Sequence, residues 1–248
     1  MLYVLLTLAT FITSIISGVL SMAGGMILMG IFSFFLSVPM AMVLHGLAQA
    51  FSNGSRVWLH RRHIRWNVLF PYTLGALIVL GTFSAFAFIP DVGLVFILIG
   101  SFPLLALVLP DSINLDMERK PVAFASGIVV TSAQMLAGAS GPVLDIFYVK
   151  SRLTRHEILG TKAVTQTLGQ VIKLVYYAVL LGTASQDLPA WVFPAVIVAA
   201  LAGNWIGKLV IERITDHQFK SAGRYIILVI GVIYIGKGGY ELFDSQMF

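Results

Sequence analysis

The chain has 248 residues, of which 58% are hydrophobic and only 11% are charged. Soluble domains carry roughly a quarter charged residues, so this composition predicts an integral membrane protein. The net charge of +5 does not indicate a nucleic-acid-binding domain, because the basic residues lie in short segments between apolar runs. The absence of cysteine excludes disulfides and thiolate metal sites.

Eight apolar runs follow one another along the chain, which predicts an all-α membrane protein. A helix needs roughly 20 apolar residues to cross the hydrocarbon core, and most runs fit one crossing. The first and fifth runs are longer, and each is interrupted by small residues, at 21–25 and at 138–142. The runs cover residues 2–37, 40–59, 67–88, 91–109, 121–149, 156–182, 189–211 and 223–243.

Two of the runs carry polar side chains at intervals of four, four and three residues. On an α-helix this spacing places all four side chains on one face. Polar groups inside a membrane usually face a cavity or the protein interior, because contact with lipid is unfavourable. The first polar stripe is His45, Gln49, Asn53 and Arg56, and the second is Lys162, Gln166, Gln170 and Lys173.

The two stripes share one offset with the two interruptions, which indicates an internal repeat. His45 aligns with Lys162 at an offset of 117 residues, and the same offset aligns Gly24 with Gly141. The match therefore extends from the interruption to the end of each stripe.

The charges of the loops predict that the two copies have opposite orientations. After the stripe, the first copy has the basic segment His60–Arg65, whereas the second has Thr183–Leu188 without Lys or Arg. Before the stripe the pattern reverses, with uncharged Ser37–Pro39 in the first copy and basic Lys150–Arg155 in the second. Since basic loops stay cytoplasmic, the copies form an inverted-topology repeat.

Inversion requires an odd number of crossings in each half, so we expect each interrupted run to be a re-entrant hairpin. The predicted fold is all-α, with two inverted-topology repeats, each a broken re-entrant helical hairpin plus three transmembrane helices. The first repeat covers 1–110, a linker covers 111–120, and the second repeat covers 121–248. Both termini are then external. The alternative is eight plain crossings with a parallel repeat, which places one basic loop on the wrong side.

The interruptions and stripes together predict an anion site near the middle of the bilayer. Helices that restart after a break, here from Met26 and Val143, direct free N–H groups and a positive dipole end at a cavity. The alternative is that the small residues only allow close helix packing and that the amides bond between helices. The expected substrate-binding set is Gly24, Gly25, Ser140 and Gly141 with the eight residues of the two stripes.

The charged members of this set have structural interpretations as well. Lys162 and Arg56 lie near helix ends, where a long basic side chain can extend to the interface. Lys173 lies nearer the middle of its helix and is harder to explain as an anchor.

Two residues are candidates for proton coupling. His45 could titrate near neutral pH, or could be a neutral hydrogen-bonding residue. Asp145 lies well inside an apolar run, so we expect it to pair with Lys162 or Lys173. Whether that carboxylate couples transport to protons or forms a permanent ion pair stays open.

No motif for catalysis is present: the chain has no HExxH, no Walker lysine loop and no GxSxG. We therefore expect no enzyme activity, no cofactor and no metal. The expected partners are a small anionic substrate and the lipid bilayer, without nucleic acid, and a homodimer is left open.

The paired motifs resemble a known family. Ser21–Gly25 with His45–Arg56, and Gly138–Pro142 with Thr161–Gln166, are similar to the TauE/SafE sulfite exporter family, also called the 4-toluene sulfonate uptake permease family. Common members carry a Gly-x-Gly-Gly-Gly-like turn in each half. This chain instead has Ala23-Gly24-Gly25 and Ala139-Ser140-Gly141-Pro142, which leaves the substrate open.

The resemblance implies a multi-pass carrier of small sulfur-containing anions such as sulfite, thiosulfate or organosulfonates, in a bacterial inner membrane. A midplane site between the repeats and alternating access are expected. The alternatives are an anion channel, a carboxylate transporter, an intramembrane enzyme acting on lipid-linked phosphate and a non-transporting assembly subunit.

Overall fold

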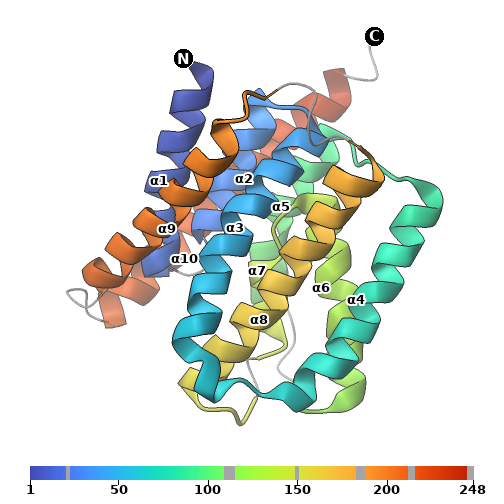
Figure 1. Ribbon diagram of the computed structural model, residues 1–248, viewed down its shortest axis with the longest axis vertical. Coiled ribbons are helices and arrows are strands. Elements are labelled where there is room, and N and C mark those ends of the chain that lie inside the picture. The colour runs from blue at the N-terminus through green and yellow to red at the C-terminus, as the bar shows by residue number, and fades with distance from the viewer. Residues whose placement is uncertain (21–22, 109–114, 149–150, 183–187, 212–215, 245–248) are drawn as a thin grey trace.

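The computed structural model describes residues 1–20, 23–108, 115–148, 151–182, 188–211 and 216–244, and within these ranges every regular element is helical (Figure 1). The predicted all-α fold is therefore confirmed. The helices are α1 (Leu2–Leu20), α2 (Ala23–Phe35), α3 (Val38–His60), η1 (Arg61–His63), α4 (Trp66–Phe86), α5 (Val92–Val108), α6 (Lys120–Ala137), α7 (Gly141–Ile146), α8 (Arg155–Leu174), η2 (Val175–Leu180), α9 (Val192–Ile211) and α10 (Asp216–Asp244).

The second long apolar run is broken where the small residues predict, whereas Ser21 and Met22 of the first predicted interruption lie outside the described residues, between α1 and α2. The second break is well defined: α6 ends at Ala137, and Gly138 follows with φ of 72°, a conformation that glycine adopts without steric cost. Helix α2 is already helical at Ala23, before the expected Met26, and α7 starts at Gly141 instead of Val143. Pro142 fits in the first turn of α7 because the N–H that it lacks has no partner there in any helix.

The helix packing falls into matching sets from the two halves. Helix α1 packs on α9 as α6 packs on α4, and α2 packs on α10 as α7 packs on α5. The remaining large interfaces are formed by α3 with α8 and by α5 with α10, which each join corresponding helices. The first helix of each hairpin, α1 or α6, therefore packs mainly on the fourth α-helix of the opposite half, α9 or α4.

One end of the molecule gathers the basic segments. The Arg65 guanidinium lies 3.2 Å from Glu157 and 3.8 Å from Glu118, and the Arg65 N–H donates to the Thr161 hydroxyl. A capping box between Thr154 and Glu157 starts α8 at the same place. The start of α1 and the end of α10 lie at the opposite end (Figure 1), so the two predicted cytoplasmic segments share one end of the molecule and these two helix ends share the other.

Two helices in the described part of the chain are long and apolar enough to cross a bilayer by length and composition, Trp66–Phe86 and Val192–Val210. Helices α3 and α8 have 23 and 20 residues. They carry the two polar stripes, which lower their mean hydropathy.

A short π-helical segment was not expected from the sequence. It extends α8 through Val175–Leu180 and turns two aromatic side chains inward. The Tyr176 hydroxyl donates to the Phe88 carbonyl at 2.7 Å, and the Tyr177 hydroxyl donates to the Met135 carbonyl at 2.8 Å. The segment thus ties the end of α8 to α6 and to the α4–α5 connection.

Glycine allows α4 and α6 to approach closely, which gives the first prediction. A Cβ on Gly127 would overlap the Tyr72 carbonyl oxygen, whereas a Cβ on Gly81 of α4 would meet nothing within 4 Å. We expect Gly127→Ala to lower the free energy of unfolding by about 1–3 kcal/mol. Gly81→Ala should raise it by about 0.5–1 kcal/mol, because alanine is the better helix former.

Unfolding of the two variants in the same detergent compares them directly. Equal shifts of the same sign would show that α4 and α6 are not in contact through Gly127.

Candidate functional site

The polar stripes of α3 and α8 face each other in the interior of the molecule. The two helices are antiparallel there, because Gly46 lies beside Leu174 and Gly160 lies beside the carbonyl of His60. Six of the eight side chains are buried, and Arg56 and Gln166 are partly exposed. The structure therefore brings the two predicted stripes together, with the start of one against the end of the other.

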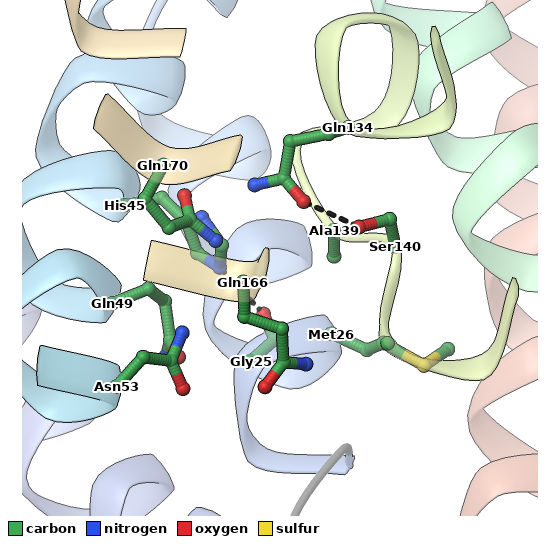
Figure 2. Close-up of a pocket in the computed structure, with 11 residues that line it drawn as sticks. Gly25, Met26, His45, Gln49, Asn53, Gln134, Ala139, Ser140, Gln166 and Gln170 are labelled. Carbon is green, nitrogen blue, oxygen red and sulfur yellow. Dashed lines mark hydrogen bonds between the residues drawn. The ribbon is translucent and has the colours of Figure 1, made fainter. Parts of the chain in front are cut away.

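A polar cavity lies between the stripes and the two helix breaks (Figure 2). Its free volume is about 30 Å³, above the roughly 10–15 Å³ that one water molecule needs. Side chains from α3 and α8 approach it from one side, and the turn between α6 and α7 closes the other. The lining residues are Gly25, Met26, His45, Gln49, Asn53, Gln134, Ala139, Ser140, Gly141, Gln166 and Gln170.

Four side-chain amides around this cavity, those of Gln49, Asn53, Gln166 and Gln170, have no hydrogen-bond partner among the described residues. Gln49 and Asn53 are 6% and 4% exposed, and Gln170 is 5% exposed. Leaving a buried polar group unpaired costs about 1–3 kcal/mol, so such groups normally bind water or a ligand. The cavity thus offers amide N–H donors that the protein itself does not use, together with amide oxygens, of which Gln170 Oε1 is a buried acceptor without a partner among the described residues.

His45 and Lys173 form a hydrogen-bonded chain that joins the two breaks. His45 Nε2 lies 2.9 Å from the Gly25 carbonyl oxygen, which can only accept, so Nε2 carries the proton. His45 Nδ1 is then the acceptor for Lys173 Nζ at 2.8 Å, and Lys173 also donates to the Gly138 carbonyl at 2.8 Å. Lys173 therefore lies behind His45, outside the cavity lining, and in this arrangement the imidazole is neutral.

Arg56 holds the other hairpin in an equivalent way. Its Nη2 donates to the Ser17 carbonyl at 3.0 Å and lies 3.3 Å from the Asn204 side-chain oxygen. Ser17 lies in the last turn of α1, where the helix dipole favours a cation. The closing cation of each stripe, Arg56 or Lys173, thus binds the carboxyl end of the first hairpin helix of its own half. Neither acts as an interfacial anchor.

Lys162 forms an ion pair with Asp145 of α7. This pairing is one of the two that the sequence predicts, and it links the start of the α8 stripe to the second hairpin helix. The two side chains are 10% and 29% exposed. Neither lines the central cavity, and Lys162 lines instead a second cavity that it shares with Arg56.

The small residues divide into two groups. Gly25, Ser140 and Gly141 line the central cavity, as expected. Gly24 does not, because a Cβ there would overlap the Thr13 carbonyl of α1. Its role is close packing of the hairpin, which is the structural interpretation that the sequence left open.

Sequence reasoning missed two polar residues. Gln134 of α6 lines the cavity and accepts a hydrogen bond from the Ser140 hydroxyl at 2.5 Å (Figure 2). Asn204 of α9 binds Arg56 and donates to the Ser55 hydroxyl at 3.0 Å. Each is a single amide in an otherwise apolar run. A lone polar residue in such a run is the sequence signal that could have identified it.

These features define a class: a helical membrane protein whose two broken hairpins meet two polar helices around a small, donor-rich cavity. The family model of the sulfite exporter TauE/SafE matches residues 6–234. The chain therefore belongs to this family, as the motifs suggested. No curated protein and no solved structure matches the chain.

Family membership makes the chain a membrane transporter of the class that exports sulfite and related sulfur-containing anions. The family is one of transporters and not of enzymes.

Proposed function

We propose that the protein carries small sulfur-containing oxyanions, such as sulfite, thiosulfate or an organosulfonate, and binds them in the central cavity. The observation that carries this proposal is the set of unpartnered amides of Gln49, Asn53, Gln166 and Gln170. An amide NH₂ group donates up to two hydrogen bonds, and a compact oxyanion presents several acceptor oxygens in a small volume.

The surrounding charge favours an anion in this cavity over a cation. Lys173 forms no ion pair with any described residue and lies one hydrogen bond behind His45. An anion bound in the cavity would stabilise the charged form of this buried amine, because opposite charges attract strongly over a short distance in a medium of low dielectric constant. The amides then supply direct contacts, while the cation supplies long-range attraction.

Transport would follow from relative movement of the two halves, arranged as an inverted-topology repeat with six crossings and two re-entrant hairpins. The matching packing of α1 on α9 and of α6 on α4 supports this arrangement. The Lys173–His45–Gly25 chain connects both hairpins at the cavity, so rocking one half against the other changes access to the anion. His45 and Asp145 are the groups through which protons would couple to that movement.

In this proposal the protein is a multi-pass protein of a bacterial inner membrane with both termini external. The shared location of His60–Arg65 and of the start of α8 at one end supports the assignment of that end to the cytoplasm.

Uptake into proteoliposomes tests the function. Purified protein should take up labelled sulfite or thiosulfate with saturation, and unlabelled sulfite should compete. Protein carrying Gln49→Leu, reconstituted at equal density, is the matched control. Uptake by the wild type that is no faster than uptake by this variant would contradict the proposal.

A further inference from the structure

A second cavity lies between α3 and α8, toward the end of the molecule that carries the basic segments. Its volume is about 20 Å³. Gln166 lines both cavities, so the second one adjoins the central cavity on the side of the basic loops. Its lining residues are Arg56, His60, Leu159, Lys162, Ala163 and Gln166.

Arg56 supplies this cavity with positive charge and free donors. The guanidinium contacts only neutral acceptors through Nη2, on Ser17 and Asn204, and forms no ion pair within the described part of the chain. Its Nε and Nη1 groups make no hydrogen bond with the described residues. A guanidinium has five N–H donors in a planar fork that suits oxyanions, so most of that capacity is unused.

Lys162 and Gln166 add donors to the same cavity. The Lys162 ammonium uses one hydrogen bond for Asp145 Oδ1, and an ammonium has three. The Gln166 amide is unpartnered among the described residues. Because Asp145 neutralises Lys162, Arg56 supplies the net charge of the cavity.

We propose that this second cavity is a separate oxyanion position, through which the substrate passes between the central cavity and the aqueous phase at the basic end. The proposal rests on the proposed function and assigns attraction of the anion and binding of the anion to two different positions. The second position attracts the anion through the charge of Arg56, and the central position binds it through neutral amides. Gln166 borders both positions and transfers the anion between them.

The test separates the rate of transport from equilibrium binding. Arg56→Gln should slow initial sulfite uptake about tenfold or more, the loss expected for one charge-assisted hydrogen bond. Its dissociation constant for sulfite, measured by titration calorimetry, should change by less than about threefold, because the central amides are intact. Arg56→Lys should recover part of the rate, since it keeps the charge without the fork.

Two further variants make the result decisive. Arg61→Gln is the matched control, because Arg61 lies at the same end but donates to the Trp58 carbonyl at an exposed position. Ala163→Leu fills the second cavity without removing a charge and should slow uptake as Arg56→Gln does. Ala163→Leu also tests the second position if Arg56→Gln fails to fold because its bonds to Ser17 and Asn204 are lost.

Uptake in Arg56→Gln and Ala163→Leu as fast as in Arg61→Gln would overturn the second position. Loss of binding in parallel with rate would also overturn it, by assigning Arg56 to the central site. Failure of the proposed function itself has another signature, because the wild-type protein would then neither bind nor take up sulfite.

Discussion

Replacing Gln49 or Gln166 with leucine is expected to weaken sulfite binding by one to two orders of magnitude while leaving the fold intact. Each amide faces the central cavity without a partner among the described residues. A hydrogen bond to a charged group contributes about 1.5–3 kcal/mol, so each substitution should weaken binding roughly 10- to 150-fold. The double variant should bind sulfite below detection, because both amides are expected to contact the same bound anion.

The fold should tolerate these changes because neither amide supports the protein. Removing a side chain that makes no hydrogen bond leaves no protein group unpaired, so the unfolding temperature should not fall. Phe51→Leu is the control on the same helix, since Phe51 is 43% exposed on the outer face of α3. It should bind sulfite like the wild type. Normal binding by both glutamine variants would show that the anion lies elsewhere.

Removing one member of the Lys162–Asp145 pair is expected to cause the largest loss of stability. Lys162→Met leaves the Asp145 carboxylate, which is 29% exposed, without its partner, and this should cost up to about 3 kcal/mol, the lower end of the range for buried pairs. Replacing both residues, as Lys162→Met with Asp145→Leu, should recover most of that free energy, because the unpaired charge is gone. Chemical or thermal unfolding in detergent measures both differences.

The Lys237–Glu241 pair is a matched control for this experiment. The two carboxylates are about equally exposed, at 28% for Glu241 and 29% for Asp145, but Lys237 is 29% exposed against 10% for Lys162. Lys237→Met should therefore cost less than about 1 kcal/mol, as expected for a pair on a helix surface. Equal losses for the two lysine variants would show that the Lys162–Asp145 pair is not protected from solvent.

The double variant Lys162→Met with Asp145→Leu also distinguishes the two interpretations of Asp145. If the carboxylate couples transport to protons, the refolded double variant should no longer accumulate sulfite in response to a pH gradient. If the pair is only structural, accumulation should still respond to the gradient.

Much of the architecture could be predicted because its signals are local and occur twice. Apolar runs give helices, the small residues around Gly24 and Gly141 give breaks, and the spacing from His45 to Arg56 gives a buried face. The antiparallel contact of the two stripes followed from loop charges alone.

The partners of the site residues could not be predicted, since spacing fixes a face but not what lies opposite. Arg56 and Lys173 were expected to contact the anion, and the sequence did not predict that each also binds the carboxyl end of a hairpin helix. These contacts depend on backbone carbonyls at helix ends that only the folded chain brings near the two side chains. The contact of Gly24 with Thr13 could not be predicted either, because it depends on how closely α1 and α2 pack in the folded chain.

The central claim is that amides from two antiparallel helices converge on one oxyanion. Selenite has the pyramidal shape of sulfite and a strong anomalous scatterer, so a structure of the protein with selenite locates the anion directly. The predicted result is an anomalous peak in the central cavity, within hydrogen-bonding distance of Gln49, Asn53, Gln166 and Gln170. An empty cavity at saturating selenite, or a peak that none of these amides contacts, would contradict the claim.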